Sequence, residues 1–144
     1  ETIRDGSERM PDGLVIDSYA ILCLLEGEPD ADEVAELLTS GPEPLLMTYV
    51  NLGEVLYTIM RERGPDHADA ALLALEASRL VFVPAERTLT LAAAHLKATH
   101  RVSYADAFCA ALAQISGFAL VTGDPEFRDL ERKVQVHWLG ESGG

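Results

Sequence analysis

Basic residues are scarce in this sequence of 144 residues, and one long segment has none. The chain contains 11 Lys and Arg against 24 Asp and Glu, which gives a formal net charge of −13, and no Lys or Arg lies between Arg9 and Arg61. This charge repels polyanions at long range, which argues against a protein that coats nucleic acid. The acidic segment suits a metal ion or a basic partner, although most of its carboxylates are typical of a solvated surface.

Cysteine and long apolar segments are equally rare. The two cysteines, Cys23 and Cys109, lie in apolar stretches and are too few for a disulfide framework, so we interpret them as buried free thiols. No apolar run, residues 19–25 included, has more than seven members, whereas a membrane-spanning helix needs about 18. Residues 1–13 also have no apolar core of the kind found in a signal peptide. We therefore expect a cytoplasmic protein that does not enter a membrane.

Short apolar runs alternate with helical patterns along most of the chain. Strands are expected at residues 14–17, 45–48, 80–83, 119–122 and 134–138. Helices are expected at residues 19–26, 30–40, 49–63, 67–78, 86–99, 103–116 and, briefly, 125–130. Unbroken apolar strands are typical of parallel strands that are buried on both faces. The pattern predicts a single α/β domain over residues 14–140, a three-layer sandwich with a central, mainly parallel five-stranded sheet flanked by helices. Residues 1–13 are expected to be a flexible arm or vector-derived residues.

Four acidic residues are placed where such a sheet binds ligands, beyond the carboxyl ends of its strands. Asp17 ends the first expected strand, Glu54 lies near the start of the helix after the second, Asp106 opens the helix that leads into the fourth, and Asp124 follows the fourth.

Helix capping is the competing interpretation for three of these residues. Glu54 follows Asn51 by three positions, and Asp106 follows Ser103 by three, as in a capping box; Asp124 precedes a proline, as an N-cap often does. For Asp17 we see no such role, because it follows three apolar residues and is expected to be buried.

A cluster of buried carboxylates is costly unless a cation compensates its charge. The set is all oxygen, and neither cysteine nor histidine shows ligand spacing, so Mg²⁺ or Mn²⁺ is expected rather than zinc. Such an ion can activate a water molecule and neutralise charge on a phosphate under attack. No glycine-rich loop follows the first expected strand, which excludes nucleotide binding of that type.

The motifs around the four acids resemble those of PIN-domain ribonucleases, and among these the VapC-type toxins of bacterial toxin–antitoxin pairs. The matching segments are Leu14-Val-Ile-Asp-Ser-Tyr-Ala20, Thr48 with Asn51-Leu-Gly-Glu-Val55, Ser103-Tyr-Ala-Asp-Ala-Phe-Cys-Ala-Ala111 and Leu120-Val-Thr-Gly-Asp-Pro-Glu-Phe127. One departure is Tyr19, where many members carry a small hydroxyl residue; it either narrows the groove or packs on the sheet, and we favour packing.

The resemblance implies a Rossmann-like sheet of order 3-2-1-4-5 and Mg²⁺- or Mn²⁺-dependent endonucleolytic cleavage of RNA by a metal-activated water. It also implies a homodimer and inhibition by a small cognate antitoxin. Carried over to this chain, Asp17, Glu54, Asp106 and Asp124 become both the catalytic residues and the metal ligands. Thr122 supports the site, and Ser18 is a neighbour of it.

The acidic chain must still hold RNA. Arg61, Lys97 and Arg101 are the expected phosphate contacts, while the competing interpretation is that Arg61 and Lys97 only complement helix dipoles. An antitoxin arginine could fork onto two of the carboxylates. The main alternative function is a catalytically silent PIN-like protein that only binds a partner. A phosphoacceptor receiver domain would need a second acid near Asp17, and a small-phosphate hydrolase would need an Asp where Tyr19 stands.

Overall fold

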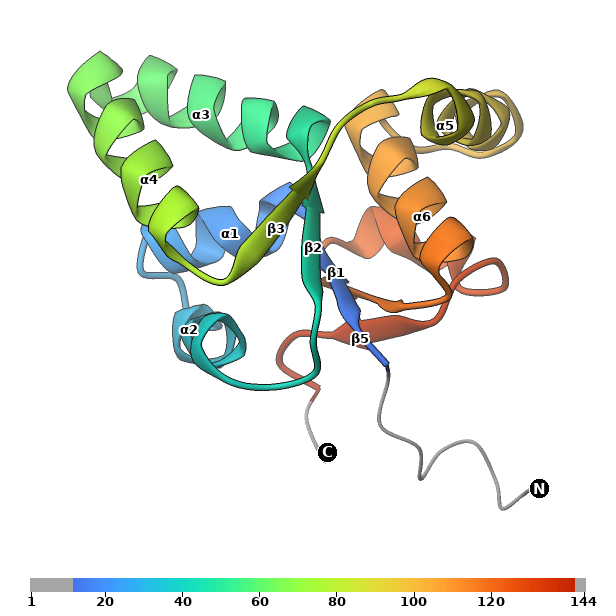
Figure 1. Cartoon of the computed structure of the whole chain (residues 1–144), viewed down its shortest axis with the longest axis horizontal. Coiled ribbons are helices and arrows are strands. Elements are labelled where there is room, and N and C mark those ends of the chain that lie inside the picture. The colour runs from blue at the N-terminus through green and yellow to red at the C-terminus, as the bar shows by residue number, and fades with distance from the viewer. Residues whose placement is uncertain (1–11, 142–144) are drawn as a thin grey trace.

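The computed structural model describes residues 12–141, and it contains the predicted alternation of strands and helices (Figure 1). Most of the expected arm, residues 1–11, lies outside the described part. The strands are β1 (Leu14–Ile16), β2 (Leu45–Thr48), β3 (Leu80–Val83), β4 (Ala119–Thr122) and β5 (Val136–Trp138). The helices are α1 (Ser18–Leu25), α2 (Ala31–Thr39), α3 (Tyr49–Arg63), α4 (Pro65–Ala77), α5 (Arg87–Thr99), α6 (Tyr104–Ser116) and the 3₁₀ helix η2 (Pro125–Leu130). Within residues 12–141, no helix combines the length and the apolar character needed to cross a membrane.

The five strands form one sheet of order β3-β2-β1-β4-β5, and every neighbouring pair is parallel. The predicted α/β sandwich is therefore confirmed. The order of the strands reverses at β1, because the chain builds outward from it first through β2 and β3, then through β4 and β5. Loops that leave β1 and β4 diverge at this switch point and open a crevice at the carboxyl edge of the sheet.

Two apolar cores lie on opposite faces of the sheet. Leu14 and Ile16 of β1 point into a core shared with α1, α2, α3 and α4, whereas Val15 points into a core shared with α5, α6 and η2. Figure 1 shows these two groups of helices on either side of the strands. β1 is thus buried on both faces, which explains why its sequence is an unbroken apolar run.

The boundary between α3 and α4 differs from the sequence expectation. Gly64-Pro65 is a strong breaker pair, and the second helix was expected to start at residue 67; instead α4 begins at Pro65 itself. Proline fits the first position of a helix, because the N–H that it lacks would have no partner there. Gly64 takes a positive φ of 95° and allows the sharp turn between the helices.

Candidate active site

The four predicted acids lie at the carboxyl edge of the sheet, each near the N-terminus of a helix, and within the described residues only Asp106 and Asp124 of the four belong to a set of three carboxylates within 4.8 Å of one another. Asp17 is the N-cap of α1, Glu54 lies in the second turn of α3, Asp106 in the first turn of α6, and Asp124 is the N-cap of η2. A pocket of about 240 Å³ opens between these helix starts, and Glu54, Asp106 and Asp124 line it. Asp17 lies beneath it, with 1% of its surface exposed.

The capping interpretations are partly right. Ser103 caps α6 by accepting a hydrogen bond from the Asp106 N–H (3.1 Å), and Asp124 caps η2. Asn51 and Glu54 form no capping box, because Thr48 caps α3 and leaves the Glu54 carboxylate free to face the pocket. Asp17, for which we expected no such role, accepts a hydrogen bond from the Ala20 N–H (2.8 Å) at the start of α1.

Asp17 is a buried carboxyl group with two hydrogen-bond donors. The Thr122 hydroxyl donates to its Oδ2, and the Ala20 N–H donates to its Oδ1. Burial raises the pKa of Asp17 to about 7; the two hydrogen bonds oppose this shift, and the nearby charges of Asp124 and Glu54 add to it. The Thr122 hydroxyl also accepts from the Asp124 N–H (2.9 Å), so one side chain joins two of the acids.

Asp106 is the most strongly perturbed of the pocket-lining acids. Burial raises its pKa to about 8, with further contributions from the charges of Asp124 and Asp17, from a hydrogen bond with Glu126, and from the charge of Glu54. These charges act on one another only because four segments far apart in the sequence come together here. The cluster therefore holds protons near neutral pH that isolated carboxyl groups would have lost.

Glu126 is an acid of the pocket that the sequence reasoning missed. One carboxylate oxygen each from Asp106, Asp124 and Glu126 lie within 4.8 Å of one another. Glu126 follows Asp124 by two positions, and this spacing in the first turn of η2 is the signal that would have found it. Three carboxylate oxygens at this spacing suit a hard divalent cation, and no lysine or arginine lines the described pocket to compensate the charge instead.

Tyr19 stands at the rim of the pocket rather than in the sheet packing that we favoured. Its side chain is 40% exposed and lines the pocket together with Ser18. The ring lies so close to Gly123 that a Cβ there would be 2.7 Å from the Tyr19 Cε1. Glycine at position 123 is therefore required by the close approach of the Tyr19 ring, between Thr122 and Asp124.

The three predicted phosphate contacts lie outside this pocket. The Arg61 guanidinium stacks over the ring of Tyr57 at 4.9 Å, in the last turn of α3. The Lys97 ammonium donates to the Val102 carbonyl (2.9 Å) and closes the turn between α5 and α6. Arg101 is exposed in that same turn, beside a second pocket that Asp129 also lines. Their role toward RNA stays a prediction.

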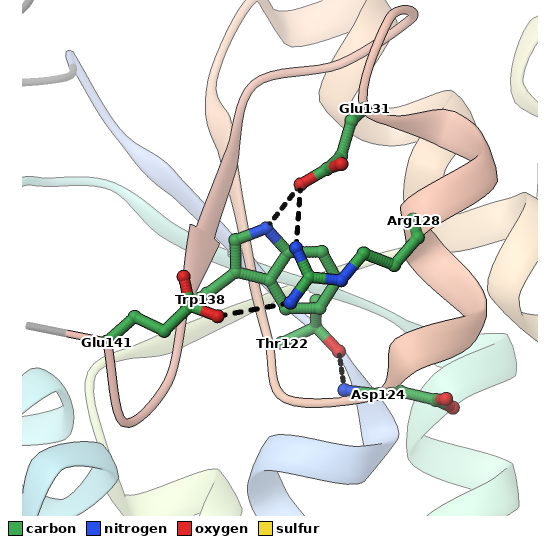
Figure 2. A network of polar contacts seen from close by, with 6 residues as sticks. All are labelled: Thr122, Asp124, Arg128, Glu131, Trp138 and Glu141. Atoms are coloured by element: carbon green, nitrogen blue, oxygen red, sulfur yellow. Dashed lines mark hydrogen bonds and ion pairs between the residues drawn. The ribbon is translucent and has the colours of Figure 1, made fainter.

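A cluster of charged and aromatic side chains holds η2 against β5 (Figure 2). The Arg128 guanidinium stacks on the Trp138 ring at 4.2 Å and pairs with Glu131 (3.4 Å) and Glu141 (3.1 Å). The Trp138 indole N–H donates to Glu131 (2.7 Å). Trp138 lies opposite Thr122 in the β4–β5 ladder. This cluster of Arg128, Glu131, Trp138 and Glu141, which we call the exposed clamp, therefore lies next to the hydroxyl that joins Asp17 and Asp124.

The fold and the pocket together define an α/β protein with an acidic crevice at the switch point of a parallel sheet. Residues 14–133 match the family described as PIN domain, and the chain belongs to this family. No match is found among curated protein sequences.

Several solved structures share the fold at low sequence identity. VapC20 of Mycobacterium tuberculosis, a toxin that cleaves the sarcin–ricin loop, is 18% identical with a TM-score of 0.69, over 84% of this chain and 95% of its own. VapBC2 of Rickettsia felis, bound to a DNA fragment from its promoter, is 14% identical with a TM-score of 0.69, over 87% and 97%. FitAcB of Neisseria gonorrhoeae is 18% identical with a TM-score of 0.65, over 85% and 95%.

Proposed function

We propose that this PIN-domain protein is a Mg²⁺- or Mn²⁺-dependent endoribonuclease and the toxin of a VapC-type toxin–antitoxin pair. The observation that carries the proposal is the acidic pocket itself: Glu54, Asp106, Asp124 and Glu126 line it with no lysine or arginine beside them among residues 12–141, and Asp17 is buried nearby. The shared fold with VapC20, described as a toxin that cleaves the sarcin–ricin loop, supports the choice of RNA as the substrate.

The residues that would hold the cation are Asp17, Glu54, Asp106 and Asp124, with Glu126 as an additional ligand. A bound divalent cation would lower the pKa of a water molecule and neutralise charge on the phosphate. Asp106 or Asp124 would accept the proton of the water molecule that attacks phosphorus, because each faces the pocket. Thr122 would keep Asp17 and Asp124 oriented through its two hydrogen bonds.

Binding of RNA by so acidic a chain would depend on a few local cations. Arg61 and Arg101 are exposed and able to contact phosphates that flank the scissile one; Lys97 would have to release the Val102 carbonyl first. We therefore expect weak general affinity for RNA and selection of a particular shape around the cleavage site.

An antitoxin is the proposed protein partner. The fold neighbours include a toxin–antitoxin complex from Klebsiella pneumoniae as well as the VapBC2 structure. A third pocket is lined by Glu26, Glu28 and Glu62. It shares Tyr19 and Leu22 with the acidic pocket, so the acidic surface continues along α1 and α3. A basic segment would fit this surface, and an arginine could occupy the place of the cation. We also propose that the protein forms a homodimer and acts in the cytoplasm.

Cleavage of RNA by the purified protein tests the function. Wild-type protein with Mn²⁺ should cut RNA, and EDTA should stop the reaction. Asp17→Asn should lower the rate of RNA cleavage by more than about 100-fold while the protein stays folded. Loss of a residue that only orients a metal ligand typically costs about 10- to 100-fold, and loss of a metal ligand itself should cost more.

Glu33→Gln is the matched control, because Glu33 pairs with His137 away from the pocket, and it should cleave at the wild-type rate. Cleavage by Asp17→Asn at the wild-type rate would refute the site. Wild-type protein that cleaves no RNA with Mn²⁺ but binds a basic partner tightly would favour the catalytically silent alternative.

A further inference from the structure

Asn51 is a fully buried amide that occupies a point between three helix starts. None of its surface is exposed, and its neighbours Ser18 and Thr48 are also buried. Its side-chain NH₂ donates one hydrogen bond to the Ser18 Oγ (3.1 Å) and one to the Ala105 carbonyl (3.1 Å). The amide therefore bridges α3 to α1 and to α6, although Ser18 and Ala105 are 33 and 54 residues away in sequence.

The remaining groups around Asn51 are also paired. The Thr48 hydroxyl donates to the Asn51 Oδ1 (2.5 Å) and accepts from the Asn51 N–H (2.9 Å), which sets the orientation of the amide. The Ser18 hydroxyl donates to the backbone carbonyl of Asn51 (3.1 Å). Both amide hydrogens and the amide oxygen thus have partners, and a buried network in which every member is satisfied is rigid and specific in geometry.

Each helix start in this network carries one of the acids. Ser18 directly follows Asp17, Ala105 directly precedes Asp106, and Glu54 lies one turn after Asn51 on the same helix. α6 covers the opposite face of the sheet from α1, and α3 begins beside it at the carboxyl edge (Figure 1). The amide therefore links, across this edge, helices whose apolar faces pack in two separate cores.

We propose that Asn51 is a positioning residue, whose side-chain amide fixes the starts of α1, α3 and α6 relative to one another and so sets where Asp17, Glu54 and Asp106 lie around the proposed cation site. This role rests on the proposed function. It differs from plain packing, because a leucine of similar size would fill the same space and could not make the two bridging hydrogen bonds.

Binding of Mn²⁺ to the full chain, measured by titration calorimetry together with thermal unfolding, tests the role. Asn51→Leu should weaken Mn²⁺ binding by about 10- to 100-fold, as is typical for residues that orient metal ligands. Ile59→Ala is the matched control: Ile59 is buried in the same helix, two turns further on, and its loss should lower the melting temperature but leave the Mn²⁺ affinity unchanged.

Three further variants keep the test decisive if Asn51→Leu does not fold. Ser18→Ala removes one partner of the amide and should weaken Mn²⁺ binding to a smaller degree. Thr48→Ser keeps the hydroxyl that orients the amide and should bind Mn²⁺ as the wild type does, whereas Thr48→Val should not.

The outcomes separate this role from the proposed function. If wild-type protein binds Mn²⁺ and cleaves RNA while Asn51→Leu or Ser18→Ala binds Mn²⁺ equally well, the positioning role is overturned and the function stands. If wild-type protein binds no Mn²⁺, the proposed function is overturned and the positioning role with it.

Discussion

Asp17, Glu54 and Asp106 stand on a buried, uncharged network around Asn51, whereas Asp124 and Glu126 stand on a short 3₁₀ helix that buried apolar side chains and an exposed charged cluster hold in place. The first support is made of hydrogen bonds between side chains with little or no exposed surface. The second has an apolar part, the fully buried Phe127 and Leu130. Its charged part is made of Arg128, Glu131 and Glu141, whose side chains are 42–56% exposed, together with the Trp138 ring.

The difference concerns how firmly each half of the pocket is set. Leaving a buried polar group without its partner costs about 1–3 kcal/mol, whereas an exposed ion pair contributes about 0–1 kcal/mol. The Asn51 side should therefore be rigid and insensitive to salt. The charged contacts on the η2 side should instead be sensitive to salt.

Among changes to the two supports, the largest effect is expected at Thr122, where they meet. Thr122→Val keeps the shape but leaves Asp17 Oδ2 and the Asp124 N–H without a partner, so it should lower the free energy of unfolding by about 1–3 kcal/mol. It should also slow RNA cleavage by about 10- to 100-fold. Urea denaturation and a cleavage assay measure both. Thr122→Ser restores the hydroxyl and should behave as the wild type; equal behaviour of the valine variant would show that the joint is dispensable.

A second, intermediate effect concerns pH. The pKa values of Asp17 and Asp106 are raised on folding, from 3.8 to about 7 and about 8. Between pH 3.8 and these raised pKa values, the folded chain therefore binds more protons than the unfolded chain. The contribution of these two groups to the free energy of unfolding is complete below pH 3.8 and is lost as the pH rises through 7 and 8. With EDTA present, the contribution of these groups should lower the melting temperature as the pH rises from 6 to 9.

Asp106→Asn provides the control for this pH dependence, because it removes the group with the higher pKa. The melting temperature of this variant should fall less over the same range. Added Mn²⁺ should restore the stability of the wild type at alkaline pH, since the cation replaces the protons. An equally steep fall in wild type and variant would indicate that Asp106 does not titrate in this range.

The smallest effect is expected in the exposed clamp. Arg128→Gln removes the ion pairs with Glu131 and Glu141 and should lower the free energy of unfolding by less than about 1 kcal/mol at low salt, and by less still at high salt. Urea titrations at two salt concentrations measure this. A large, salt-independent loss would mean that the two supports of the pocket are equally rigid.

Much of the fold could be predicted from local patterns. The unbroken apolar runs at β1 and β4 require burial on both faces, which forces parallel strands and helices on each side of the sheet. The acids could be found because they directly follow these runs or open the neighbouring helices. The break at Gly64-Pro65 is confirmed, because α3 ends at Arg63, and local rules missed only that the next helix begins at Pro65 itself.

The amino-acid order by itself determined the layers, the parallel strands and the edge at which Asp17, Glu54, Asp106 and Asp124 gather, because hydrophobic periodicity and strand ends are local properties of a chain. Only the tertiary structure decided that Glu126 joins these acids, that Tyr19 lines their pocket, and that Asn51 ties three helices together. The raised pKa values of Asp17 and Asp106 were likewise decided only by the tertiary structure. Each depends on the distance between groups far apart in sequence, and such distances are set by packing across the sheet.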